Sequence, residues 1–321
     1  MLISEPFNEM CSLAQAKFIR MTKAHALFHL LFLILGVSEL FFFLSSFALF
    51  SKSLFLAIFL ATLFLTSFAY FVLLFYFQAK KPEQFNEIKH WYLDQYQERH
   101  QHIKAKAALH FAKSLENQEY NYYLFSFFPK SLDPSFQKLS CMWHWKDVLQ
   151  MREILLCESI QEYIKWIKFQ PDDLETHAAL GEAYLELGSL YQEREKKENW
   201  TPRKSADTVK FRASMERAIE EFKIIEHFLP DDLWVHSKLA MIYHHLKMRD
   251  KEIEEYETIH RFAPEDLNTL LRLGILYFEQ GHSVKGLKIY QQLKESNAHL
   301  AEELIAHYDA YAHPLFQEMS N

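Results

Sequence analysis

Glycine, proline and cysteine are scarce in this chain. Its 321 residues include only 6 glycines, 9 prolines and 3 cysteines. Because glycine and proline mark most turns, their low number favours long helices with few connections. The scattered glycines also exclude a glycine-rich phosphate-binding loop. The cysteines, Cys11, Cys141 and Cys157, show neither a disulfide framework nor a metal-ligating spacing, which fits a reducing compartment.

Recognisable catalytic motifs are also lacking. The chain has 17 histidines but no His-Glu-x-x-His sequence. His25 and His29 share a helical face at i, i+4, yet no third ligand stands near them in sequence. No cysteine and histidine stand in a nucleophile context. We therefore expect no enzyme, no catalytic residue, no metal, no cofactor and no small-molecule substrate.

Charge is unevenly distributed along the chain. Residues 140–321 carry 22 Lys and Arg against 32 Asp and Glu, whereas residues 1–139 carry 13 against 10. An acidic second half argues against nucleic acid as a ligand. It favours a protein or peptide partner with basic segments.

Two long apolar runs are the clearest positive feature of the first half. Ala26–Phe50 and Leu54–Phe77 are separated only by residues 51–53. At 1.5 Å per residue, each run would form a helix longer than the bilayer core of about 30 Å. The short connection forces an antiparallel hairpin. The alternative, a buried helix pair in a soluble core, rarely has apolar runs of this length.

Basic residues flank the hairpin on one side. Lys17, Arg20, Lys23, Lys80 and Lys81 lie outside the runs, and Lys52 alone lies in the turn. The positive-inside rule places both termini in the cytoplasm of an integral membrane protein, which we expect in a bacterial inner membrane. The lipid bilayer would be contacted through residues 26–77.

Glu39 lies in the middle of the first apolar run, where an ionised carboxylate is costly. One interpretation is a carboxylate that senses protons or a partner. The other, which we favour, is a neutral acid that bonds to the second helix or to another copy, for example through Thr62, Thr66 or Ser67.

Residues 80–139 read as a juxtamembrane linker of helical and aromatic character. Pro82 suits the first turn of a helix, and an apolar stripe from Phe85 to Phe111 predicts one or two amphipathic helices over 82–118. Core packing of this stripe is favoured over a helix lying on the membrane. The aromatic run 120–128 would cover the repeats or touch the bilayer, and 129–140 would be a connector.

A short phrase recurs in the second half. It begins at Pro171, Pro230 and Pro264, and the last two are 34 residues apart. After the leucine of each phrase come another leucine at +6, a small residue at +7 and a tyrosine at +10, which share one helical face. The small residue would let a second helix approach closely. The positions involved are Leu180, Gly181 and Tyr184; Leu239, Ala240 and Tyr243; and Leu273, Gly274 and Tyr277.

These sets, with second-helix aromatics such as Phe222, Tyr256 and Tyr290, resemble the tetratricopeptide repeat (TPR) family. The resemblance covers roughly residues 140–312. It implies an all-α fold in which a two-helix transmembrane hairpin (24–79), after an N-terminal cytoplasmic tail (1–23), precedes a TPR-like α-α solenoid.

The ends and one repeat of this region depart from the pattern. We interpret 140–170 as a degenerate first unit and 299–312 as a capping helix. The interval from Pro171 to Pro230 exceeds one repeat by about 25 residues, so an insertion falls near 192–212. It reads as a helix extension and loop, or as a partner-contacting arm with Trp200 as an anchor.

In TPR proteins the first helix of each pair lines a concave groove. The resemblance implies a groove that runs from acidic through mixed aromatic to apolar, although the chain's own capping helix could cover some of its aromatics. Ala178 and Glu182 stand where a carboxylate-clamping subclass has Lys and Asn, so we expect no docking of a C-terminal carboxylate. The expected groove residues are Glu175, Glu182, Glu186, Trp234, Lys238, Met241, His245, Leu271, Arg272, Ile275 and Phe278.

The sequence therefore predicts a membrane-anchored TPR adaptor or scaffold that binds a basic and apolar protein segment on the cytoplasmic face. Two alternatives stay open. One is a structural subunit of a membrane complex that assembles through the hairpin. The other is a secreted protein of the inclusion-membrane type, which such a hairpin also resembles.

Overall fold

The computed structural model describes residues 4–49, 53–96, 101–122, 133–197 and 204–319, and every element in these ranges is helical. The chain divides into two compact units, Met1–Glu162 and Tyr163–Asn321. The all-helical fold class expected from the scarcity of glycine and proline is confirmed for these residues. The expected anchor Trp200 and residues 123–128 of the aromatic run lie outside them.

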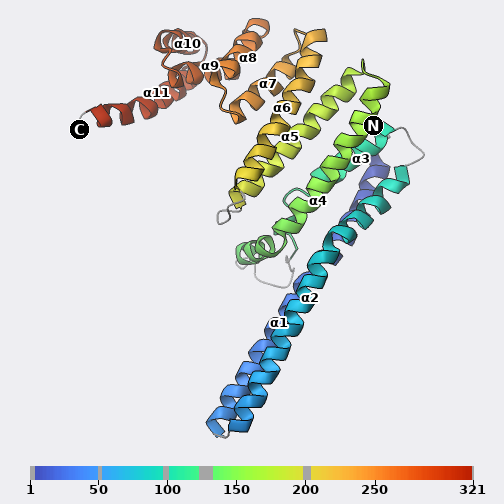
Figure 1. Ribbon diagram of the computed structural model, residues 1–321. Coiled ribbons are helices and arrows are strands. Elements are labelled where there is room, and N and C mark those ends of the chain that lie inside the picture. Colours follow the sequence, from blue (N-terminus) through green and yellow to red (C-terminus); the bar gives the residue numbers. More distant parts are fainter. Residues whose placement is uncertain (1–3, 50–52, 97–100, 123–132, 198–203, 320–321) are drawn as a thin grey trace. The chain divides into compact units, whose positions relative to one another are not determined.

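Two long helices dominate the first unit. Helices α1 (Ser4–Leu49) and α2 (Ser53–Leu93) lie side by side (Figure 1). Each is long and apolar enough to cross a membrane, and the most apolar 18-residue window of each has no buried residue. Leucines and phenylalanines that a soluble domain would bury are exposed along both helices, as at Phe41, Phe64 and Phe75. The two expected apolar helices are therefore present.

Both helices continue well beyond the apolar runs, which the sequence did not indicate. We expected a new helix to begin at Pro82, but Pro82 lies inside α2. A proline in a helix interior removes one backbone hydrogen bond and crowds the preceding turn. Packing compensates for this cost, because Phe85, Ile88 and Tyr92 beyond the proline are buried. The side-chain amide of Asn86 also donates to the Pro82 carbonyl at 3.0 Å.

The first half of α1 belongs to the core of the first unit. We expected residues 1–23 to be a tail, but Cys11, Ala14 and Phe18 are buried. The Phe18 and Phe85 ring centroids lie 5.6 Å apart, and Gln15 donates to the carbonyl of Ser114, the last residue of α3 (Gln101–Ser114), at 2.7 Å. Short 3₁₀ helices, Asp94–Tyr96 and Gln118–Tyr120, flank α3.

The apolar stripe that follows the hairpin is core, as favoured from the sequence. Tyr92, Tyr96, Ala107 and Phe111 are buried, and the Tyr92 and Phe111 rings lie 4.9 Å apart. The stripe therefore packs α2 against α3 within the protein instead of against lipid.

Helix α4 (Asp133–Phe169) differs most from the expectation. We expected a connector over 129–140 and a degenerate helix pair over 140–170, but residues 133–169 form one uninterrupted helix. No glycine or proline occurs after Pro134 until Pro171, so nothing in the sequence forces a turn. Within the first unit, ion pairs hold α4: Lys81 contacts Asp147 at 2.8 Å and Lys89 contacts Glu158 at 2.8 Å.

The recurrent phrase begins a helix each time. Helices α5 (Leu174–Lys197), α7 (Leu233–His245) and α9 (Leu267–Glu279) all start at the phrase's leucine. The aspartate before that leucine caps the helix. Asp232 accepts from the backbone N–H groups of Trp234 and Val235, and Asp266 accepts from that of Asn268. Such a side chain satisfies backbone donors that the first helical turn leaves unpaired.

Each of these helices packs against the next one in sequence. The pairs are α5 with α6 (Lys204–Phe228), α7 with α8 (Arg249–Phe262) and α9 with α10 (Ser283–Ser296). The pairing depends on small residues, as expected. A Cβ added at Gly181 would lie 2.9 Å from the Phe222 ring of α6, and one at Gly274 would lie 2.9 Å from Ile289 of α10.

The insertion lengthens the first of these pairs. Residues 192–197 extend α5 and residues 204–212 extend α6, in agreement with a helix extension. The two extended segments contact each other, because Arg194 lies 3.8 Å from the buried Asp207. Helix α6 also contacts α7, and α8 contacts α9.

Helix α11 (Ala298–Met319) covers the last pair, as expected of a capping helix. Ala301 and Leu304 are buried in one cluster with Leu273 and Leu276 of α9 and Leu293 of α10. Helix α11 thus buries part of the apolar surface of α9 and α10.

Candidate protein-binding surface

Glu182, Trp234 and Lys238 lie together where α5 meets α7. The Lys238 ammonium contacts Glu182 Oε1 at 3.1 Å and lies 5.3 Å from the centre of the Trp234 ring. The indole packs edge-on against Phe222, 5.6 Å between centroids, and is still 41% exposed. The three expected groove residues therefore form one partly exposed cluster with an aromatic centre.

Other expected groove residues of α5 and α7 are also at least partly accessible. Glu175 and Met241 are exposed, whereas Glu186 and His245 are half-buried. Burial, and next to it the charge of His244, lowers the pKa of His245, so this imidazole is neutral at pH 7. Acidic side chains of α5 and apolar or aromatic side chains of α7 are thus accessible to a partner.

The apolar end of the expected groove is not on the surface. Leu271, Ile275 and Phe278 are buried, in the same core cluster as Leu304. The Phe278 ring lies 4.7 Å from that of Tyr308 on α11. The capping helix thus covers the Phe278 ring, which is the alternative that the sequence left open for the groove aromatics, and Leu271 and Ile275 are buried in the same core. The apolar end is removed from the candidate site.

Arg272 takes part in a buried ion-pair network. It donates to Glu252 Oε1 at 2.8 Å, and Arg249 donates to Glu252 Oε2 at 2.7 Å. Glu252 is completely buried. It occupies the position at which the other pairs have Ala218 and Gly286, so a carboxylate there requires cationic partners. A glutamate at a repeat position where the other pairs have a small residue is the sequence feature that could have indicated this ion-pair network.

A second contact, missed from the sequence, recurs in two helix pairs. His177 Nδ1 donates to Glu221 at 2.6 Å, and Nε2 donates to the Pro171 carbonyl at 2.9 Å. His236 does the same with Glu255 at 2.6 Å and the Pro230 carbonyl at 2.8 Å. Both ring nitrogens of His236 face acceptors, so its two bonds form together only when the imidazole carries both protons. The sequence signal of this contact is a histidine three residues past the leucine of the phrase.

The protonation of His236 makes stability depend on pH. Burial, the largest single influence, lowers its pKa, but bonds to Glu255 and Pro230 together with nearby carboxylates outweigh burial and raise the pKa above 6.5. The resulting stabilisation is complete below about pH 6.5 and is lost as pH rises through the folded-state pKa. We expect backbone amides of α7 and α8 to exchange faster with deuterium at pH 8 than at pH 6, after correction for intrinsic rates.

The matched variant for this prediction is His236→Gln, which should lose about 2 kcal/mol of protection at pH 6. Between pH 6 and pH 8, the protection of α7 and α8 in this variant should change by no more than the protection of α9 does. An unchanged pH dependence in the variant would show that His236 is not the titrating group.

One group among the described residues has metal-ligating atoms close together, namely Glu226, His236 and Glu255, within 4.8 Å of one another. The ammonium group of Lys223 already pairs with these carboxylates. Lys223 Nζ lies 2.7 Å from Glu226 and 3.3 Å from Glu255. The arrangement is that of an internal ion pair, and a metal ion would have to displace the ammonium.

Glu39 bonds to the second helix of the hairpin. Thr66, one of the three partners named from the sequence, donates to Glu39 Oε1 at 2.6 Å. The bond joins α1 to α2 within one chain, so it agrees with the favoured interpretation of an internally bonded acid.

Comparison with models of known protein families finds none that matches this chain, and comparison with curated proteins finds no significant relative.

Proposed function

We propose that this chain is a membrane-anchored adaptor of the TPR type, with a cytoplasmic α-α solenoid that binds a protein segment. The proposal places α1 and α2 in a bilayer, which we infer to be a bacterial inner membrane, with both termini on the cytoplasmic side. The observation that carries it is the pair of long apolar helices whose most apolar windows bury no residue. Only lipid or another protein can cover so much apolar surface.

The helix pairs of the second unit support the binding part of the proposal. First and second helices alternate, small residues lie at their contacts, and neighbouring pairs touch through α6 with α7 and α8 with α9. Repeats stacked in this way present their first helices as a binding surface. On α5 the carboxylate of Glu182 pairs with Lys238, which lies over the exposed Trp234 ring of α7.

The partner inferred from this surface is a segment with a basic part and an apolar part. The basic part would lie against Glu175, Glu182 and Glu186, and an apolar side chain would pack on Trp234. The apolar part is smaller than the sequence implied, because Leu271, Ile275 and Phe278 are buried in the core.

Copurification of the full chain from its native membranes tests this function. Residues before 80 are needed, because Phe18 and its neighbours complete the core of the first unit. The double variant Glu182→Lys, Glu186→Lys should reduce recovery of the partner several-fold by charge repulsion. The matched control Glu216→Lys, Glu254→Lys changes as many charges at exposed positions of α6 and α8, and should recover wild-type amounts.

Equal recovery by both double variants would contradict a binding role for α5. A partner that is instead lost on Glu39→Leu, with both double variants normal, would favour assembly through the hairpin.

A further inference from the structure

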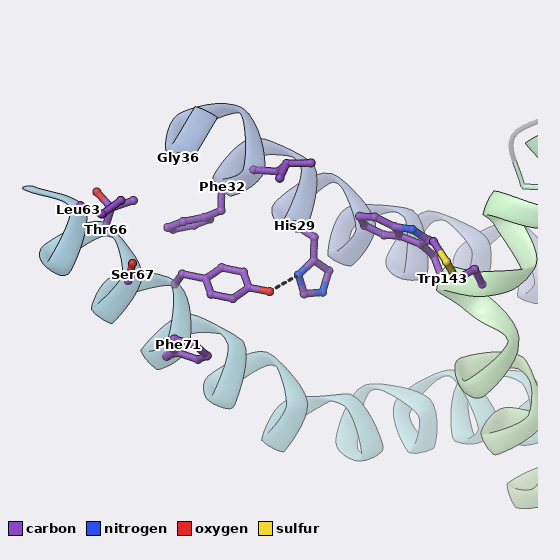
Figure 2. A pocket seen from close by; sticks show the side chains of 11 residues that line it. His29, Phe32, Gly36, Leu63, Thr66, Ser67, Phe71 and Trp143 are labelled. Atoms are coloured by element: carbon purple, nitrogen blue, oxygen red, sulfur yellow. Dashed lines mark hydrogen bonds between the residues drawn. The ribbon is translucent and has the colours of Figure 1, made fainter. Parts of the chain in front are cut away.

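A cavity of about 680 Å³ opens between the two hairpin helices (Figure 2). One wall is a single face of α1 from His29 to Gly36, with residues at i, i+3, i+4 and i+7. The other wall is a face of α2 from Leu63 to Phe71. Trp143 of α4 closes one end, as Figure 2 shows. All residues that line the cavity, including Trp143, belong to the first unit.

The cavity is mainly apolar, with polar groups at the Trp143 end and the hydroxyls of Thr66 and Ser67 on the α2 wall, of which Thr66 is already bonded to Glu39. Near Trp143, His29 Nδ1 and the Tyr70 hydroxyl are hydrogen bonded at 3.1 Å, and the indole lies 5.7 Å from the imidazole. Gly36 lies seven residues further along α1, or roughly 10 Å deeper in the proposed bilayer. An amphiphile with its polar group near His29 and an apolar chain directed along Phe32 and Leu33 toward Gly36 fits this lining.

A second cavity of about 450 Å³ lies on the other side of Trp143. It is formed by α1 from Lys23 to Leu30 and by an apolar face of α4 that includes Phe136 and Leu139. Lys23 is exposed and forms no ion pair with any residue that the structure describes. It lies six residues, roughly 9 Å, before His29, on the side that the proposed topology assigns to the headgroups.

We propose that the hairpin cavity binds an acyl chain of an anionic phospholipid whose headgroup phosphate pairs with Lys23. Acyl chains are the apolar molecules present at this depth, and the exposed Leu33 and Phe71 make the cavity walls continuous with the lipid-facing surface. A basic side chain at headgroup level favours anionic over zwitterionic lipid. The inference rests on the membrane insertion contained in the proposed function.

The test is native mass spectrometry of the full chain released from nanodiscs of equal phosphatidylglycerol and phosphatidylcholine. The wild-type protein should retain phosphatidylglycerol. Gly36→Leu should reduce the retained lipid about tenfold. A Cβ at Gly36 meets no atom within 4 Å, so the new side chain fills the cavity without disturbing the helices. The control Val37→Leu alters the neighbouring, 60% exposed position outside the cavity and should retain lipid normally.

The charge is tested separately. Lys23→Gln should abolish a preference for phosphatidylglycerol of about fivefold, since one lysine near an anionic surface contributes about 1 kcal/mol. Arg20→Gln removes the same charge from an exposed position that lines neither cavity, and should leave the preference unchanged.

Several results would overturn the assignment. The first is a wild-type protein that retains no lipid, and the second is a Gly36→Leu variant that retains as much lipid as the wild type. The third is a wild-type dimer that the Gly36→Leu substitution dissociates, because this result would assign the cavity to a second copy of the chain. Carbonate extraction separates these from failure of the proposed function. A chain that stays in the membrane but holds no lipid contradicts only the cavity assignment, whereas a chain that is extracted contradicts the anchor itself.

Discussion

Phe222→Ala is expected to destabilise the second unit by about 3–5 kcal/mol, the cost of truncating a fully buried phenylalanine. The Phe222 side chain is completely buried in the cluster formed by α5, α6 and α7. Its ring fills the space that Gly181 leaves on α5, and it supports the exposed Trp234 of α7. The truncation therefore loosens both the contact within the first helix pair and the contact with the next.

The measurement is hydrogen–deuterium exchange of the full chain in detergent, followed in peptides from α5, α6 and α7. The matched control is Phe228→Ala, the same substitution on the same helix at a side chain that is 56% exposed. This control should change protection by no more than about 0.5 kcal/mol. Similar losses for both variants would show that the Gly181–Phe222 contact does not hold the pair together.

Trp234→Ala is expected to weaken partner binding about 30-fold, which corresponds to about 2 kcal/mol. A large aromatic ring that is fixed on one edge and open on the other is the kind of side chain that dominates binding energy. Phe222 holds the edge of the Trp234 ring, and Lys238, itself paired with Glu182, lies over its face. The indole thus needs little reordering when a partner docks.

The affinity is measured with the partner recovered in the copurification. Phe262→Ala is the control, because Phe262 is a 43% exposed aromatic side chain on a second helix, α8. It should bind normally, and exchange in α7 should confirm that Trp234→Ala remains folded. Normal binding by a folded Trp234→Ala would remove the α5–α7 surface as the partner site.

Features that depend on local pattern could be predicted from the sequence. The apolar runs, the aspartates that cap α7 and α9, and the close contacts of Gly181 and Gly274 each follow from residues within one or two helical turns. The same holds for the apolar stripe after the hairpin, because burial of one face is visible in the spacing of its residues.

Features that depend on distant contacts could not be predicted in this way. A proline usually begins or ends a helix, and only the burial of Phe85 and Tyr92 against other helices lets α2 continue through Pro82. In the same way, the sequence does not say that α1 completes a core with α3. The extent of α4 was missed because a resemblance to repeats imposed a turn that no residue there requires.

The candidate site was predicted only in part, because some of its residues depend on local pattern and others on distant contacts. Glu182, Trp234 and Lys238 come together because α5 and α7 both begin at the recurrent phrase and both pack against α6. Phe278 also lies on the first-helix face expected to line the groove, but its exposure depends on where α11 packs, and no repeat rule fixes that position. The bonds of His177 and His236 were missed because they form only when Glu221 and Glu255 reach these histidines from the second helices.

The most direct test of the account is alkaline carbonate extraction of membranes that contain the full chain, beside a chain lacking residues 26–77. The account predicts that the full chain stays in the membrane pellet and that the shortened chain moves to the supernatant, because the apolar α1–α2 hairpin spans the bilayer. Release of the full chain by carbonate would contradict the anchor, and with it the proposed role at a membrane.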